Sequence, residues 1–348
     1  MMPGSTVSRG KGLARLGCAA ALGSLLALAL SAPAWSINNK AGTSGAQFLK
    51  LGAGSRAGGM AEAYSAVADD VYALYYNPGA LTRLTGSQLG GAHTEHFQDI
   101  GYEFAGFAYP LGRGEEGSKH VIGAAIYNLS VSDIERRTED TDSPIGTFGA
   151  GDYSYNLTYA RRFDPRLSAG ITGKYIHQDL DSFSADAFAV DMGLLYLPRP
   201  DASRPLSFAA VLKNWGTRPS YVVVSDPLPL GFTLGVGYQA IPKRLKLDLD
   251  LTKYRDTDIF AAAGGEYVHP FTPAVSGALR MGFTTHRREN QGLNEIALGA
   301  GINFHRLSFD FAWVPFGTLG NTFRYSLLLR FGQPEAPETA QAAPAQSK

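Results

Sequence analysis

Cysteine is nearly absent from this sequence of 348 residues, which contains only Cys18. A chain with one cysteine forms no internal disulfide, and Cys18 lies in an N-terminal segment that we expect to be removed, so thiol chemistry is excluded as well. Acidic residues are missing before Glu62. Long apolar runs are also missing, because no segment after residue 36 has the roughly eighteen consecutive apolar residues of a membrane-spanning helix.

The N-terminus has the composition of a secretory signal peptide. Three basic residues precede an apolar region at 16–30, and small residues follow at 32–36. We therefore expect residues 1–36 to be a signal peptide. A lipoprotein signal is the alternative, although Cys18 precedes most of the apolar region and Arg15 stands where a lipobox has an apolar residue.

Neither sign of charge is in excess. The chain has 31 basic and 31 acidic residues, and removal of the three basic residues of the signal leaves 28 against 31, a net charge of −3. This balance gives no support for a nucleic-acid partner. The seven histidines lack metal-ligand spacing, and neither a P-loop lysine motif nor a G-x-S-x-G elbow is present. We expect no cofactor, no metal and no enzyme activity; a barrel lipase with an isolated Ser and His is an alternative that the sequence leaves open.

Alternation is the feature that the sequence has in abundance. From Gly86 onward, apolar and polar residues alternate in segments of about eight to twelve residues, near the length with which a tilted strand crosses a bilayer. Between Leu245 and Leu251, leucine occupies every second position and Lys or Asp the others. We expect fourteen strands, at 86–97, 100–110, 120–129, 153–163, 167–177, 185–197, 206–215, 229–240, 245–254, 259–268, 274–284, 295–304, 307–314 and 323–331.

Aromatic residues gather near the ends of these strands, as in the interfacial girdles of a transmembrane barrel. We assign Tyr153, Tyr196, Trp215, Tyr254, Tyr267, Trp313 and Phe331 to the girdles. The sequence thus predicts an all-β fold, a 14-stranded antiparallel transmembrane β-barrel in the bacterial outer membrane. A large periplasmic β-sandwich or propeller is the alternative, since its strands would alternate too.

The connections between the expected strands also alternate in length, as they do in a barrel with both ends in the periplasm. We expect tight periplasmic turns at 164–166, 241–244, 269–273 and 305–306, and external loops at about 130–152, 216–228 and 284–294.

Residues 45–84 do not alternate. They are rich in small residues with short apolar runs, and Asp69 and Asp70 are good N-cap residues for a helix over Val71–Tyr76. Pro78 predicts that this helix ends before it. A compact, glycine-rich unit ahead of the strands predicts a small N-terminal plug with short helices. The expected division is a signal peptide at 1–36, a plug at 37–85, a barrel at 86–331 and a disordered, Pro/Ala/Gln-rich tail at 332–348.

Four short motifs in this region carry a family resemblance. They are the segments 42–52 (GTSGAQFLKLG), 55–60 (SRAGGM), 68–70 (ADD) and 76–78 (YNP). In this order they resemble the N-terminus of the PorV/PorQ family, relatives of the FadL-type outer-membrane transporters. The family reads Asn-Pro-Ala-Gly-Leu where this chain reads Asn-Pro-Gly-Ala-Leu from residue 77, which moves the residue able to adopt positive φ by one place.

Candidate site residues fall into two sets. The plug motif comprises Phe48, Arg56, Met60, Asp69, Asp70, Asn77 and Pro78. The charged residues on the strand face opposite the apolar set, which we expect to face the lumen, are Lys174, Asp191, Lys213, Lys246, Asp248, Asp250, Arg280, Asp310, Arg324 and Arg330.

Charged groups are tolerated inside a barrel only if they are paired or hydrogen-bonded. We therefore expect Arg56 to pair with a carboxylate, and Asp69 or Asp70 to cap a helix or meet a basic residue of the wall. The luminal charges either pair with one another and with the plug, or in part line a solute path. The apolar residues of the plug form its core or offer an apolar binding surface.

The resemblance implies two functions. One is a FadL-like barrel that passes hydrophobic small molecules across the outer membrane. The other is a barrel of the type IX secretion machinery that binds or shuttles secreted proteins. The implied partners are outer-membrane lipids together with hydrophobic small molecules or secreted proteins.

Overall fold

The computed structural model describes residues 42–96, 100–112, 118–140, 142–221, 224–286, 294–317 and 320–332. The expected signal peptide and nearly all of the expected tail lie outside these residues. No helix in the described part of the chain is long and apolar enough to span a membrane.

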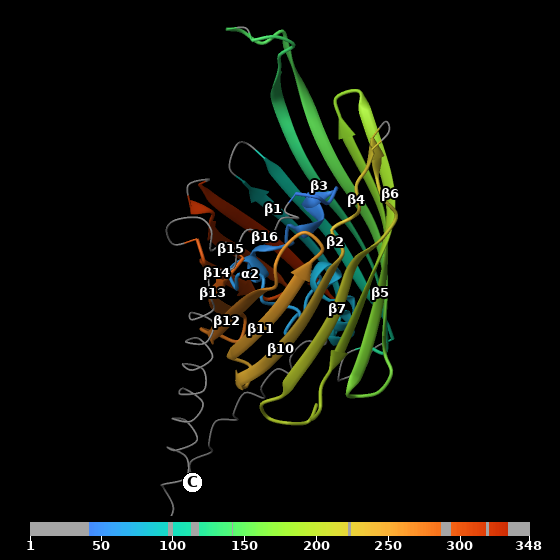
Figure 1. Ribbon diagram of the computed structural model, residues 1–348. Helices are drawn as coiled ribbons and strands as arrows, with labels where there is room; N and C mark the ends of the chain where they lie inside the picture. Colours follow the sequence, from blue (N-terminus) through green and yellow to red (C-terminus); the bar gives the residue numbers. More distant parts are fainter. Residues whose placement is uncertain are drawn as a thin grey trace, which may run out of the picture. The chain divides into compact units, whose positions relative to one another are not determined.

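Fourteen antiparallel strands form a closed barrel, which confirms the predicted fold (Figure 1). Each strand pairs with the next along the chain, and β1 pairs with β16 to close the wall, from Ser87 opposite Phe331 to Glu95 opposite Phe323. The strands are β1 (Ser87–Glu95), β2 (Gly101–Leu111), β3 (His120–Arg136), β4 (Gly146–Arg162), β5 (Leu167–Leu180), β6 (Phe183–Tyr196), β7 (Leu206–Gly216), β10 (Gly231–Ile241), β11 (Leu245–Tyr254), β12 (Phe260–Pro270), β13 (Val275–Thr284), β14 (Ile296–Phe304), β15 (Leu307–Pro315) and β16 (Asn321–Phe331).

The barrel has two distinguishable ends. At the terminus end, where β1 begins and β16 ends, the chain makes turns at 163–166, 242–244 and 305–306. At the far end, β7 and β10 are joined through a small two-stranded sheet of β8 (Ser220–Tyr221) and β9 (Val224–Ser225).

One loop prediction was wrong. The expected external loop at 130–152 is largely strand, because β3 continues to Arg136 and β4 begins at Gly146, with one irregularity between Val131 and Ile134. This hairpin projects beyond the rest of the far end (Figure 1). A hairpin outside the membrane has no lipid-facing side, so backbone hydrogen bonds alone can hold its two strands together. Its residues therefore lack the alternation of apolar and polar side chains from which the other strands were predicted.

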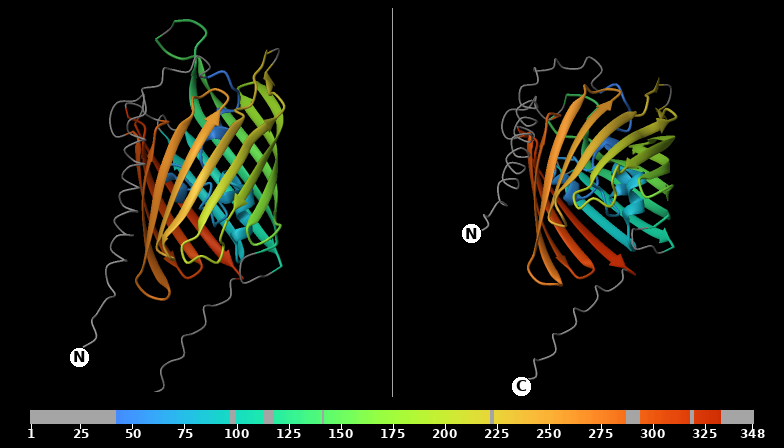
Figure 2. Two further views of the ribbon diagram at one scale, coloured as in Figure 1. Left: turned by 60° about the horizontal axis from the view of Figure 1, so that its bottom comes forward. Right: turned by 90° about the horizontal axis from the view of Figure 1, so that it is seen from below.

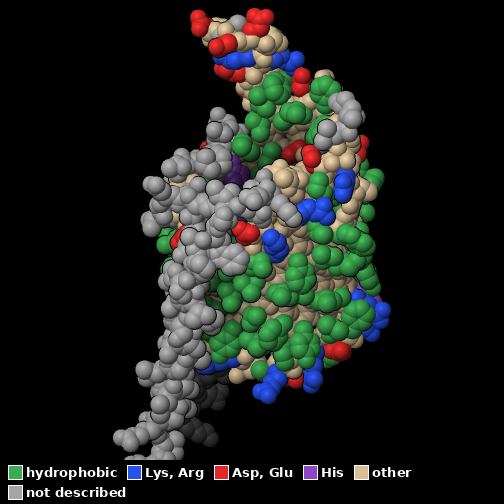
Figure 3. All heavy atoms as spheres, in the orientation of Figure 1, with side chains coloured by type: hydrophobic (Ala, Val, Ile, Leu, Met, Phe, Trp, Pro, Cys, Tyr) green, Lys and Arg blue, Asp and Glu red, His purple; other side chains and the backbone are tan. Residues whose placement is uncertain are grey.

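The outer wall is apolar. Leu157, Phe188, Leu279 and Phe309 are 73%, 61%, 67% and 47% exposed, far more than large apolar side chains on a water-soluble protein would tolerate in such number. Hydrophobic side chains cover the face of the barrel in Figure 3, with charged side chains gathered at its lower edge and on the projecting hairpin. This apolar band is the surface that meets lipid.

Most residues assigned to the aromatic girdles lie on this outer face, but Tyr254 does not. Its side chain is 6% exposed and points into the lumen. Its assignment to the girdle followed from its place at a strand end and was wrong. The leucines at odd positions of the same strand face outward, so period two places residue 254 on the inward face.

Residues 42–86 lie within the barrel, as the views in Figure 2 show. They form four short helices joined by turns, with most side chains buried. Helix α2 packs against β14, β15 and β16, and the 3-10 helix η2 packs against β4, β5 and β6. The helices are η1 (Gln47–Lys50), α2 (Ser55–Gly58), α3 (Ala73–Tyr76) and η2 (Pro78–Arg83).

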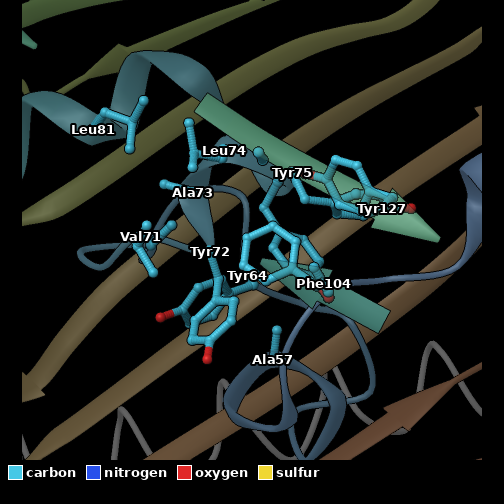
Figure 4. Packing of buried hydrophobic residues seen from close by; sticks show 14 of the residues in the cluster. Ala57, Tyr64, Val71, Tyr72, Ala73, Leu74, Tyr75, Leu81, Phe104 and Tyr127 are labelled. Carbon is cyan, nitrogen blue, oxygen red and sulfur yellow. The ribbon is translucent and has the colours of Figure 1, made fainter. Parts of the chain in front are cut away.

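Aromatic rings and small side chains hold this plug together. Tyr64, Tyr72 and Leu81 are at most 1% exposed, and Tyr72 packs against Phe104 of the wall with ring centroids 5.3 Å apart (Figure 4). These apolar residues are core, and the same holds for Phe48, Leu49, Val71 and Leu74.

The helix predicted over Val71–Tyr76 is shorter than expected. It begins at Ala73, its N-cap residue is Tyr72, and no side chain caps it. Asp70 instead accepts a hydrogen bond from the backbone N–H of Tyr72 at 3.1 Å. Asp69 does not cap the helix, because its carboxylate is used in ion pairs.

The outward position of Leu249 and Phe309 yields a prediction. Replacing either by Arg places a charge in the lipid-facing wall and is expected to lower the free energy of unfolding by about 2–4 kcal/mol at the midplane. Urea unfolding in lipid vesicles measures this loss. Phe331→Arg, on the same face at a strand end, is the control, with an expected cost of about 0–1 kcal/mol. Equal costs at the three positions would contradict the assignment of depth.

Candidate functional site

The guanidinium of Arg56 is the centre of a buried ion network. Its Nε and Nη2 donate to Glu266 of β12 at 2.7 and 2.6 Å, and its Nη1 donates to Asp69 at 2.6 Å and to Asp70 at 2.9 Å. The bidentate contact with Glu266 is the strongest geometry for such a pair. The plug is thus fastened to the wall through one arginine.

Other charges of the wall complete this network. Arg280 of β13 donates from Nε to Glu266 at 2.7 Å, and its Nη1 lies 2.8 Å from a carboxylate oxygen of Asp310, an ionic contact without hydrogen-bond alignment. Lys246 of β11 pairs with Asp69. Burial alone would raise the pKa of the Asp69 carboxyl, but Arg56 and Lys246 hold that pKa well below its ordinary value.

Two carboxylates of β11 hold the plug at a second place. Asp250 accepts from the backbone N–H groups of Tyr64 and Ser65, both at 3.0 Å, and from the Ser65 hydroxyl. Asp248 accepts from the N–H of Ala66 at 3.2 Å. A loop of the plug with no secondary structure of its own therefore has its backbone donors satisfied by the wall.

The Asn77-Pro78 turn is the third fastening. The amide of Asn77 donates to the carbonyl of Leu194 in β6 at 3.1 Å, and its oxygen accepts from the N–H of Gly79 at 3.0 Å. Gly79 lies in a 3-10 helix without positive φ, so the exchanged order of glycine and alanine does not alter the turn through backbone freedom. It matters sterically, because a Cβ at Gly79 would lie 2.7 Å from the carbonyl oxygen of Gly193.

Three of the remaining luminal candidates form separate ion pairs. Lys174 lies 2.6 Å from Asp191, and Arg324 lies 2.5 Å from Glu62 of the plug. Met60 is buried against glycines of β12 and β13 without a polar role.

Glu266 was not among the candidate site residues predicted from the sequence, yet several residues of both predicted sets lie around it in the structure. Its place on the inward side of an alternating strand was the available signal. The gathered residues are Arg56, Asp69, Asp70, Lys246, Arg280 and Asp310.

A cavity of about 360 Å³ lies between the plug and the far end; we call it the aromatic cavity. Tyr75 and Tyr76 of the plug face it, together with Tyr254, Phe260 and Phe316 of the wall and its connections. Most of its lining is apolar, which suits an apolar ligand more than a hydrated ion.

Three cations also line the aromatic cavity, Lys50, Arg324 and Lys213 of β7. Lys50 pairs with Asp256 and Arg324 with Glu62, which leaves Lys213. Its ammonium lies 3.9 Å from the ring centre of Tyr75 and 5.4 Å from that of Tyr76, and the residue is 6% exposed. Within the described ranges, no carboxylate lies at ion-pair distance from it, so the faces of the two rings are its nearest electrostatic contacts, and Asp191 acts on it from a longer distance.

A second cavity, of about 560 Å³, lies between the plug and the terminus end. We call it the basic vestibule, because seven Lys or Arg residues line it and only four Asp or Glu residues do. The two cavities lie on opposite sides of the plug. Among the described residues there is no group of three or more His, Cys, Asp or Glu side chains with the geometry of a metal site.

Several solved structures have a fold similar to that of this chain. The toluene transporter TbuX of Ralstonia pickettii superposes with a TM-score of 0.51 at 11% identity, covering 79% of this chain and 98% of that one. The toluene transporter TodX of Pseudomonas putida gives 0.52 at 11% identity over 80% and 96%. The CymD monoaromatic hydrocarbon channel gives 0.55 at 11% identity over 80% and 98%. The chain therefore has the same barrel fold as these proteins.

A family model matches part of the chain. Residues 35–199 match the family model described as type IX secretion system protein PorV. This match confirms the resemblance to the PorV family, and with the fold it indicates the bacterial outer membrane as the location. No curated protein matches the chain.

The Arg56 network predicts a large effect of a conservative change. Arg56→Gln leaves three carboxylates, of which Asp70 and Glu266 are buried, without their shared cation and is expected to destabilise the docked plug by about 3–5 kcal/mol. Urea unfolding in vesicles and limited proteolysis of the plug measure the loss. In this variant Glu266 keeps Arg280 and Asp69 keeps Lys246, whereas Asp70 has no other cation among the described ion pairs. Adding Asp70→Asn to the same chain removes this unpaired charge and is expected to restore part of the stability.

Arg166→Gln is the control for this change, because Arg166 is exposed in a turn and makes no contact with the plug. It should change stability by no more than about 0.5 kcal/mol. A plug that resists protease equally in the Arg56 and Arg166 variants would show that the network does not hold it.

Close approach of plug and wall gives a steric prediction. A Cβ at Gly193 would lie 2.3 Å from the Asn77 side-chain oxygen and 2.7 Å from Pro78 Cδ, so Gly193→Val should displace the turn. We expect cells that make this variant to become more sensitive to small polar antibiotics. In Gly173→Val, the new side chain meets open space on the outer wall, and sensitivity should stay unchanged. Similar sensitivity of both variants, once both are shown to be inserted, would contradict a sealing role for this turn.

Proposed function

We propose that this protein takes up hydrophobic small molecules at the far end of the barrel and passes them across the outer membrane. The observation that carries the proposal is the aromatic cavity, an apolar space inside a barrel wall. Its size is that of a small-molecule site. The likeness of the fold to that of hydrocarbon transporters supports, by analogy, the transport of hydrophobic molecules.

The position of the aromatic cavity fits entry from outside the cell. Tyr254 ends β11 and Phe260 begins β12, so both stand at the far end. Outer-membrane barrels have short periplasmic turns and longer external loops, which assigns the terminus end to the periplasm and the far end to the outside. A molecule in the cavity would therefore rest above the plug, with the ion network around Arg56 beneath it.

Lys213 adds a feature to this site. Its ammonium is buried among tyrosine rings, where the ring faces attract it. The ring face of an aromatic ligand would attract the Lys213 ammonium in the same way. We propose that aromatic rings among the hydrophobic molecules are the ligands that suit this cavity.

Passage onward requires the plug to move. Residues 64–66 and the Asn77-Pro78 turn belong to the plug, and both are hydrogen-bonded to the wall. We propose that this plug domain is the closed gate of the path and that release of one of these fastenings opens it.

Filling the aromatic cavity tests the proposal. Ala262 lies on its wall and is 4% exposed, so Ala262→Trp should occupy the space and lower uptake of a radiolabelled aromatic hydrocarbon in cells at least about tenfold if binding there is required. Ala261→Trp is the matched control, because its side chain lies on the opposite, outward face of the same strand. Unchanged uptake in an inserted Ala262→Trp variant would overturn the proposal.

A second function is supported by the family match, since the matching model is described as a type IX secretion system protein. A barrel in that role would bind secreted proteins. Purification from outer membranes in mild detergent, followed by mass spectrometry of the bound proteins and lipids, separates the two. Secreted proteins in the eluate favour the secretion role, and small hydrophobic molecules favour transport.

A further inference from the structure

The basic vestibule has more positive charge than its carboxylates neutralise. Its four acidic residues are engaged with Arg56, Arg280 and Lys246 in the network described above. Four further cations line the same space: Arg83, Lys243, Arg244 and Arg330. In the described part of the chain, none of the four lies at ion-pair distance from a carboxylate.

Two of these cations, Arg83 of the plug and Arg330 of the wall, have hydrogen-bond donors that no protein group in the described ranges occupies. Arg83 donates from Nη1 to the carbonyls of Ala66 and Ala68, at 2.8 and 3.2 Å. Arg330 donates from Nη1 to the hydroxyl of Ser308 at 2.7 Å. A guanidinium carries five N–H donors, so most of those on each arginine remain for a ligand.

The other two cations stand at the mouth. Lys243 and Arg244 lie in the turn between β10 and β11, are exposed, and continue the positive charge from the cavity to the solvent. Clustered charges of one sign in a cleft with low-dielectric walls concentrate counter-ions there. Guanidinium groups match the planar, two-oxygen edge of carboxylate and phosphate.

We propose that the basic vestibule is a binding site for a small organic anion with carboxylate or phosphate groups, entering from the periplasm. The site is separate from the aromatic cavity, since the plug lies between them. The anion would sit beside Arg83 and Arg330, next to the Lys246–Asp69 pair that fastens the plug. Its binding therefore stabilises the closed, docked plug, and this inference does not depend on which solute the protein transports.

Titration of the purified full-length barrel in detergent tests the site. The probes are citrate and inorganic phosphate, added in a buffer with 0.15 M sodium chloride, in which charges more than about 8 Å apart are largely screened. We expect saturable binding by calorimetry and a rise of the unfolding temperature with probe concentration, because a ligand of the native state stabilises it. Sodium chloride added to equal ionic strength should produce neither effect.

Variants locate the anion. Arg330→Gln should weaken binding about tenfold or more, since it removes a charged donor from the cavity. The double variant Lys243→Gln, Arg244→Gln changes only exposed side chains and should weaken binding by a few-fold even if the Arg330 variant folds poorly. Arg166→Gln removes one positive charge at the same end of the barrel but outside the cavity, and should bind as the parent does.

Two results would overturn the proposal. One is the absence of saturable binding of both probes above the chloride control, which would leave the vestibule with adventitious screening ions only. The other is binding that the Lys243/Arg244 double variant and Arg166→Gln weaken equally, because the anion would then respond to total charge and not to this cavity.

Discussion

The contact on which the rest of the structure depends is the one between Arg56 and three carboxylates. A charged group inside a barrel costs several kcal/mol unless it is paired, and a single guanidinium here meets Glu266 of the wall with two of its nitrogens and both aspartates of the plug with the third. The contact joins helix α2 of the plug, the later aspartate pair of the plug and the wall in one place. It holds the plug in the position seen in this structure, and that position defines the space on either side of the plug.

This position separates two environments of different chemistry. On the far side, tyrosine and phenylalanine rings surround a space in which Lys213 is the cation without a carboxylate partner in the described structure. On the terminus side, cations outnumber carboxylates. A path through the barrel would thus lead from an apolar compartment to a positively charged one.

The fit between plug and wall depends on the absence of side chains at a few wall positions. Gly170 and Gly193 face the Asn77-Pro78 turn, and Gly282 faces the backbone of Met60, where a Cβ would lie 2.1 Å from its carbonyl carbon. Glycine in a strand costs stability and is usually a sign that another backbone approaches closely. The sequence shows that glycine is abundant, but not which glycines meet the plug, because that depends on the register of strands distant in the chain.

The sequence by itself determined the barrel, its fourteen strands and which charged residues turn inward, because period two assigns every residue of a strand to one of two faces and only one face can meet lipid. It also indicated that Arg56 needs a carboxylate, from the cost of an unpaired buried charge. Only the tertiary structure decided that Glu266 is the main partner and that β3 and β4 extend into a hairpin beyond the membrane. Those outcomes depend on strand register and on contacts between segments far apart in the chain, and local periodicity contains neither.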